Sequence, residues 1–121
     1  WTLEMTGQLR FVLQQEQGQR RIFDQSTKKS YFLKDLAPDG KSPEDYAIVS
    51  RLTDSATGQM LISAAGITQY GTRAAGEFLT SSDLLRTAQV EWRKKNVQVL
   101  LHTNVYKGTP SKPKVVAVQT W

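Results

Sequence analysis

The stretch from Gln59 to Thr103 decides the fold. It reads QMLISAAGI (59–67), then a segment with helical spacing (68–96), then VQVLLHT (97–103). Both outer pieces are short, nearly continuous apolar runs. Residues 97–103, like residues 114–121 at the end of the chain, are apolar on both faces, which is typical of strands covered above and below. The order strand, helix, helix, strand is a crossover, and a crossover predicts that its two strands run parallel in one sheet.

Two helices are expected inside the crossover. Thr72 is a suitable N-cap for the first helix, whose apolar residues share one face: Ala74, Ala75, Phe78 and Leu79. Ser82 is a suitable N-cap for the second helix, in which Asp83 lies at the positive end of the helix dipole. Each helix is therefore expected to pack on the sheet through one face.

Hairpins predict antiparallel strands on both sides of the crossover. Residues 10–15 and 20–24 flank Gln17-Gly18, and residues 45–52 are joined to 59–67 by a turn. Other pieces are expected as extended segments at 31–36 and 114–121 and as a short helix at 2–9. We therefore predict an α/β fold with a mixed parallel and antiparallel sheet and helices packed on it, incomplete without upstream residues.

Composition limits the possible classes of protein. The 121 residues suit a single domain (1–121), and 39% hydrophobic residues exclude intrinsic disorder. No cysteine is present, and His102 is the single histidine, so disulfides and zinc sites built from cysteines or several histidines are excluded. No apolar run reaches the length of a membrane span, so we expect no membrane contact by this segment.

The chain begins with Trp1, which predicts that it is a fragment or processed product of a larger protein. Apolar strands that are covered on both faces need partners, and a fragment leaves some of them without one. We therefore expect self-association, or packing against an upstream domain of the same protein.

The net charge of +5 comes entirely from the second half of the chain. Residues 61–121 carry eight Lys and Arg against three acidic residues, whereas residues 1–60 carry eight of each. A basic half suits nucleic acid, an anionic ligand or simply a solvated surface. The best candidates for a protruding basic contact are Lys107, Lys112 and Lys114, although lysines in a hairpin also serve solubility.

The junction from Gly66 to Arg73 is the candidate ligand site. It joins the end of a buried strand to a helix N-terminus, where free N–H groups attract anions. Thr68 and Thr72 offer hydroxyls, Gly71 permits close approach, and Arg73 adds a positive charge, so a small anionic ligand is predicted. The alternative is structural: Gly71 permits a turn, Thr72 caps the helix and Gly76 allows close packing on the sheet.

No catalytic, metal or cofactor site is predicted. His102 lies on a strand with only Thr103 and Asn104 beside it, so we expect a histidine satisfied by one hydrogen bond. Asp39, Glu44 and Asp45 lack the spacing of a calcium loop, and we expect them in a solvated loop.

The sequence resembles the C-terminal region of uncharacterised acidobacterial proteins. The likeness spans nearly the whole chain and is carried by WTL (1–3), DYAIVSRL (45–52), AAGI (64–67), AGEFL (75–79) and KNVQV (95–99). In such proteins the region often follows a winged-helix DNA-binding domain and sometimes a membrane segment. The resemblance therefore implies a bacterial regulatory protein, cytoplasmic or, with a membrane segment, extracytoplasmic. It supplies no ligand, activity or catalytic residue.

Three functions stay open on these grounds. The first, which the resemblance favours, is a non-catalytic sensory or interaction domain of a regulatory protein. The second is a nucleic-acid-binding module that uses the basic half, although we expect no specific binding of nucleic acid by this segment alone, because it lacks a long basic run. The third is an enzyme that acts on an anionic substrate at the Gly66–Arg73 junction.

Overall fold

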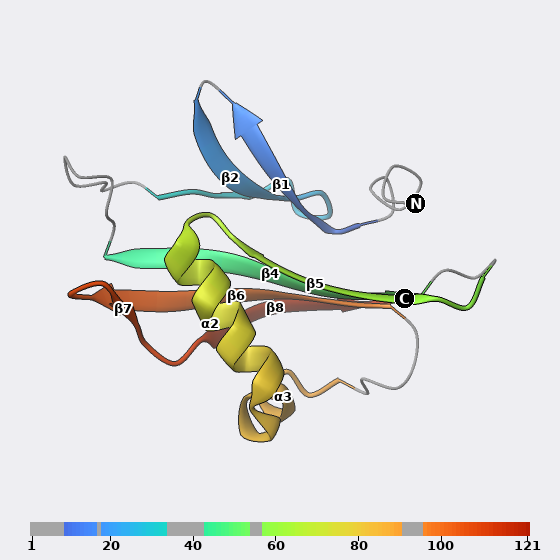
Figure 1. The fold of residues 1–121 in the computed structure, drawn as a ribbon. Helices are drawn as coiled ribbons and strands as arrows, with labels where there is room; N and C mark the ends of the chain where they lie inside the picture. Colours follow the sequence, from blue (N-terminus) through green and yellow to red (C-terminus); the bar gives the residue numbers. More distant parts are fainter. Residues whose placement is uncertain (1–8, 17, 34–42, 54–56, 91–95) are drawn as a thin grey trace.

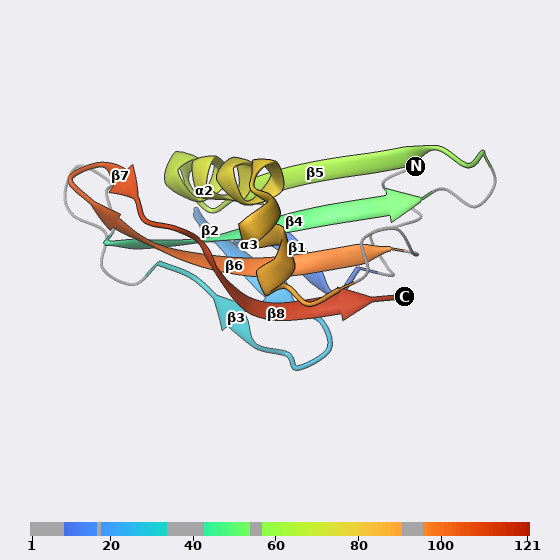
Figure 2. The same ribbon diagram turned by 90° about the horizontal axis from the view of Figure 1, so that it is seen from below.

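The computed structural model describes residues 9–16, 18–33, 43–53, 57–90 and 96–121. A small sheet contains β1 (Phe11–Glu16), β2 (Gln19–Asp24) and β3 (Ser30–Tyr31). A large sheet contains β4 (Glu44–Thr53), β5 (Met60–Gly66), β6 (Val97–Tyr106), β7 (Thr109–Pro110) and β8 (Lys114–Thr120). The helices are α2 (Gln69–Thr80) and α3 (Ser82–Thr87). The small sheet covers one face of the large sheet, and the helices cover the other (Figures 1 and 2).

The predicted α/β fold with a mixed sheet is wrong. Every pair of described strands is antiparallel, strands make up 52% of the described residues and helices 19%, and the large sheet curls into a half-barrel. The sheet order is β5-β4-β6-β7, and β8 also pairs with β6. β5 and β6 do point the same way, because both run antiparallel to β4. The crossover passes over β4 and places β6 on its far side, so β5 and β6 share no hydrogen bonds.

The two central strands bury residues on both faces. Toward the helices, β4 and β6 contribute a core of alternate residues: Ala47, Val49, Val97, Val99 and Leu101. Toward the small sheet, Ile48 and Leu100 join Phe11, Ile22 and Leu33. The expectation that residues 97–103 are covered on both faces is therefore confirmed for β6. The same expectation is wrong for β8, which lies at the edge of the sheet and is half-buried.

Both helices begin earlier than the sequence predicts. The N-caps are Thr68, whose hydroxyl accepts from Tyr70 N, and Ser81, whose hydroxyl accepts from Leu84 N. Thr72 lies inside α2, where its hydroxyl accepts a hydrogen bond from Gly66 N at 2.9 Å. The prediction that Thr72 caps the helix is therefore wrong, and the predicted cap at Ser82 is displaced by one residue.

The predicted hairpins are present. β1 pairs with β2, and β4 pairs with β5. Of the predicted extended segment 31–36, only Tyr31 belongs to a strand, and residues 34–36 lie outside the described part of the chain. The predicted helix at 2–9 falls almost entirely outside the described residues.

Candidate functional site

The chain's own Asp45 carboxylate sits at the predicted anion site. Its oxygens accept hydrogen bonds from the backbone N–H groups of Tyr46 (2.7 Å), Thr68 (3.0 Å) and Gly71 (2.7 Å). The Thr68 hydroxyl donates a further hydrogen bond to the same carboxylate. The first turn of α2 therefore binds an anion, as anions generally bind at helix N-termini, but this anion is internal.

Asp45 is fully buried and Glu44 also belongs to β4, so the expectation that they lie in a solvated loop is wrong, whereas Asp39 lies outside the described residues. Asp45 belongs to β4, whose second residue points its side chain at the start of α2. Burial raises the pKa of the Asp45 carboxyl above its ordinary 3.8, while the hydrogen bonds from Thr68, Gly71 and Tyr46 act in the opposite direction. The carboxylate ties the start of β4 to the start of α2.

Close approach explains the glycine at position 71. A Cβ atom there would lie 2.7 Å from Tyr46 O and 2.9 Å from Asp45 Oδ2. Gly71 therefore permits close approach, as predicted, but the group that approaches is the Asp45 carboxylate. The suggested packing role of Gly76 is wrong, because a Cβ atom there would meet nothing within 4 Å.

Among the four predicted ligand-binding residues, Thr68, Gly71 and Thr72 are engaged within the fold. Thr68 and Gly71 bind Asp45, and the Thr72 hydroxyl accepts from Gly66 N. Arg73 is exposed and forms no ion pair with any residue that the structure describes. A small anionic ligand at this junction stays a prediction, and only Arg73 remains open to it.

A cleft at the start of β3 and β4 brings together aromatic and charged side chains. Its volume is about 250 Å³, and it is lined by Lys29, Ser30, Tyr31, Phe32, Glu44 and Tyr46. We call it the tyrosine cleft. The rings of Tyr31 and Tyr46 lie 5.2 Å apart at a tilt of 55°, and Phe32 is partly exposed beside them. The lining residues of the cleft come from β3 and the residues beside it in the small sheet, and from the start of β4 in the large sheet.

Charges of both signs surround the tyrosine cleft. Lys29 Nζ lies over the Tyr31 ring, 4.9 Å from its centre, which is a cation–π contact. Glu44 Oε2 lies 2.9 Å from His102 Nε2, and the His102 ring meets the Tyr46 ring edge to face at 5.0 Å. Burial raises the pKa of Tyr46 above its ordinary 10.0, and the Glu44 carboxylate raises it further.

His102 has the single hydrogen bond that the sequence predicts, since among the described residues it bonds to Glu44 alone. The partner itself was missed, because Glu44 lies 58 residues away in the sequence and reaches His102 only through the β4–β6 register. The pairing of β4 with β6 is the feature that indicates this partner. Tyr46 pairs directly with His102 across the ladder, and Glu44 lies two residues before Tyr46, on the same face of β4.

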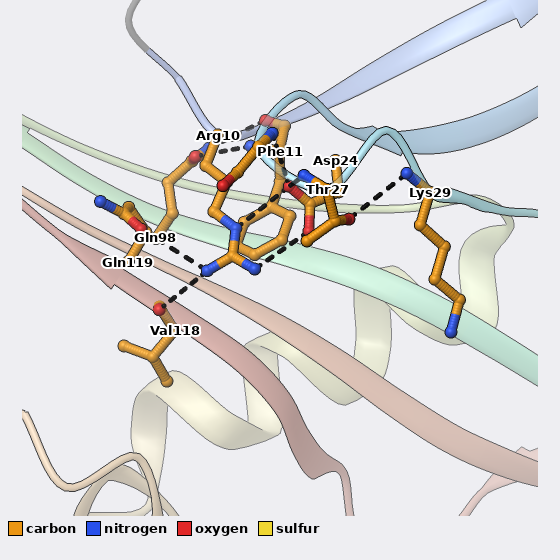
Figure 3. A network of polar contacts seen from close by, with 9 residues as sticks. Arg10, Phe11, Asp24, Thr27, Lys29, Gln98, Val118 and Gln119 are labelled. Atoms are coloured by element: carbon orange, nitrogen blue, oxygen red, sulfur yellow. Dashed lines mark hydrogen bonds and ion pairs between the residues drawn. The ribbon is translucent and has the colours of Figure 1, made fainter.

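A second polar cluster joins the small sheet to the large sheet (Figure 3). Gln98 on β6 binds both backbone groups of Phe11, accepting from its N–H at 2.9 Å and donating to its carbonyl at 3.0 Å. Arg10 forms a two-point ion pair with Asp24, at 3.0 and 3.1 Å, and also reaches the Val118 carbonyl on β8 at 3.4 Å. Arg10, Asp24 and Gln98 each form hydrogen bonds with other groups of the fold, so we assign this cluster no binding role.

The predicted basic residues Lys107, Lys112 and Lys114 are all exposed, on the hairpin that connects β6 to β8. Lys107 Nζ lies 5.6 Å from the centre of the Tyr106 ring, and Tyr106 is 75% exposed. A contact with a partner through these lysines stays a prediction.

Comparisons with protein-family models, with curated proteins and with solved structures find no match to this chain. The resemblance to acidobacterial regulatory proteins therefore stays a prediction. In the part of the chain that the structure describes, no group of three or more metal-ligating side chains comes together. None of the described helices is long and apolar enough to cross a membrane.

Proposed function

We propose that this chain is a non-catalytic sensory or interaction domain of a bacterial regulatory protein, and that the tyrosine cleft is its ligand-binding site. The observation that carries the proposal is the meeting of two tyrosine rings and the Glu44 carboxylate in one cleft of about 250 Å³. Concave sites with aromatic walls and a few charged groups are typical of small-molecule recognition.

The chemistry of the tyrosine cleft favours an organic cation as ligand. The faces of tyrosine rings carry negative charge density and attract ammonium and guanidinium groups. Lys29 already holds an ammonium group over Tyr31, so the chain itself supplies a cation at this position. Glu44 adds a full negative charge to the same cleft. A ligand ammonium would replace that of Lys29 on the Tyr31 ring.

Binding of a simple cation tests this function. We expect tetramethylammonium chloride to shift the ring resonances of Tyr31 and Tyr46 in NMR spectra, relative to sodium chloride at the same ionic strength. Glu44→Gln should weaken this response, and Glu77→Gln, on the exposed face of α2, should not. Tyr106 serves as an internal control because its ring is exposed and lies on another hairpin.

Lys29→Ala gives the sharper prediction. Removal of the internal ammonium group should strengthen tetramethylammonium binding about two- to fivefold, since an exposed cation–π contact is worth about 0.5–1 kcal/mol. Lys112→Ala, which removes an exposed lysine far along the chain from the cleft, should leave the affinity unchanged. Equal shifts at Tyr106, or weaker binding in Lys29→Ala, would contradict the proposal.

Nucleic acid is the second candidate partner. The observation in its favour is the highly exposed Tyr106 ring beside Lys107, because aromatic and basic groups together bind single strands. If this hairpin binds single-stranded DNA, affinity should fall steeply as salt rises, and Tyr106→Ala should weaken it severalfold. Phe32→Ala, which removes a ring in the tyrosine cleft, is the matched control. Binding that ignores both salt and Tyr106 would exclude this interface.

A further inference from the structure

The two edges of the large sheet differ in how they are protected. At the β8 edge, Lys114 begins the strand, the ladder is irregular between Leu100 and Leu101, and Arg10 reaches the Val118 carbonyl. Charges and irregularities of this kind keep an edge from pairing with other chains. At the β5 edge none of these devices is present in the strand from Met60 to Gly66. It pairs with β4 in one unbroken register and, among the described strands, with β4 alone.

Within the part of the chain that the structure describes, β5 has backbone groups without a hydrogen-bond partner on its outer side. Ile67 N donates to Tyr46 O on β4, whereas Gly66 N turns outward to the Thr72 hydroxyl. Because backbone direction alternates along an antiparallel strand, the N–H groups of Met60, Ile62 and Ala64 also face outward. At Gly66 the outward N–H group is already bound by the Thr72 hydroxyl, so no further strand can use it. The segment 60–65 is therefore an open template for one more strand.

The exposed side chains of β5 are apolar and uncharged. Met60 is 54% exposed and Ile62 is 50% exposed, and Leu61 is exposed between them. The sequence carries no charged residue from Thr57 to Thr72, although the chain as a whole has a net charge of +5. Two copies of a basic chain repel each other across most of their surface, so an uncharged edge is where they can approach.

We propose that β5 pairs antiparallel with β5 of a second copy of this chain, about a two-fold axis at Ser63. The strand has large side chains at one end and small residues at the other: it reads MLI (60–62), then Ser63, then AAG (64–66). Pairing about Ser63 places each large residue opposite a small one: Leu61 opposite Ala65, and Ile62 opposite Ala64. Ile62 and Ala64 both have outward N–H groups, so they form the hydrogen-bonded pairs of this register.

An apolar groove next to β5 fits the same register. It has a volume of about 240 Å³ and lies between β1 and the strands β4 and β5, lined in part by Phe11, Leu13, Ile48, Ser63 and Ala65. Side chains that lie opposite each other in a ladder share one face of the sheet. Leu61 of the second copy, opposite Ala65, would therefore lie at the mouth of this groove.

Sedimentation velocity over a range of concentrations tests the dimer. Five or six paired residues bury less surface than a standard interface of about 1,600 Å², so we expect a weak dimer that forms at micromolar concentrations or above. Ile62→Lys should weaken it at least tenfold. Val116→Lys is the matched control, since Val116 is 44% exposed on the opposite edge strand. A chain that stays monomeric up to millimolar concentration would overturn the proposal.

Cysteine cross-linking tests the register without relying on a disruptive change. The chain has no cysteine, so each variant carries a single thiol. Ser63→Cys should form a disulfide-linked dimer on mild oxidation, because residues that face each other across a non-hydrogen-bonded pair lie about 4.5 Å apart at Cα. Leu61→Cys, which is displaced from the axis, should cross-link far less. Cross-linking by Val116→Cys instead would assign the contact to β8 and refute the proposal.

Discussion

At the residue scale, Asp45 carries the main difference between the sequence-based prediction and the structure. The residue types Thr68, Gly71 and a helix N-terminus correctly indicate a place for an anion. The anion is Asp45, 23 residues earlier in the chain, and only the β4–β5 pairing brings it there. A pattern within one segment reveals the donors of a site, whereas the acceptor depends on tertiary structure.

Gly71→Ala tests this account of the junction. The new Cβ atom would lie within 3 Å of Tyr46 O and Asp45 Oδ2, so β4 and α2 must separate. We expect a loss of about 1–3 kcal/mol in the free energy of unfolding, measured by urea denaturation. Gly76→Ala is the control in the same helix: its Cβ atom meets nothing within 4 Å, so it should gain about 0.5–1 kcal/mol. Equal stabilities for the two variants would show that the contact at Gly71 relaxes freely.

At the element scale, local patterns predict hairpins and buried strands better than they predict neighbours. The turn at Gly18 and the alternation along β4 identify their strands, because both signals come from adjacent residues. The crossover from β5 to β6 fixes only the relative direction of these strands. Nothing in residues 59–103 reveals that β4 lies between them, since that depends on which side of β5 the hairpin folds. The predicted mixed sheet fails for this reason.

The helix starts differ for a related reason. Thr68, Thr72, Ser81 and Ser82 are all acceptable caps by residue type. Thr72 is drawn into a hydrogen bond with Gly66 N at the end of β5, and Thr68 is then left to cap α2. A contact with the neighbouring strand therefore decides between two equivalent local choices.

At the scale of the whole molecule, polar ties hold the small sheet on the large one. Gln98 binds Phe11 across the layers, and Arg10 bridges the end of β2 to β8 (Figure 3). Asp24 anchors Arg10 and also accepts hydrogen bonds from Ser26 N and Thr27 N. Asp24 is buried, so we expect its ion pair with Arg10 to stabilise the packing of the small sheet on the large sheet.

The pH dependence of stability tests the role of Asp24. Burial alone would raise the pKa of this carboxyl, but the hydrogen bonds from Arg10, Ser26 and Thr27 outweigh it and lower the pKa from 3.8 to about 2. A carboxyl whose pKa is lower in the folded state stabilises the fold above pH 3.8, and this contribution is lost as the pH falls toward 2. This contribution of Asp24 to the free energy of unfolding amounts to about 2 kcal/mol. The raised pKa of Asp45 has the opposite sign, because its contribution is present at low pH and is lost as the pH rises above 3.8.

Asp24→Asn should therefore lower the free energy of unfolding by about 2 kcal/mol at pH 7 and have little effect at pH 2. The wild-type chain should lose stability between pH 5 and pH 2, while the variant should show a flatter profile over the same window. Asp83→Asn is the control, since the Asp83 side chain is exposed and its pair with Arg86 is a surface contact. Urea denaturation at a series of pH values measures all three proteins. Parallel profiles for the wild type and Asp24→Asn would mean that the Arg10–Asp24 pair does not hold the two sheets together.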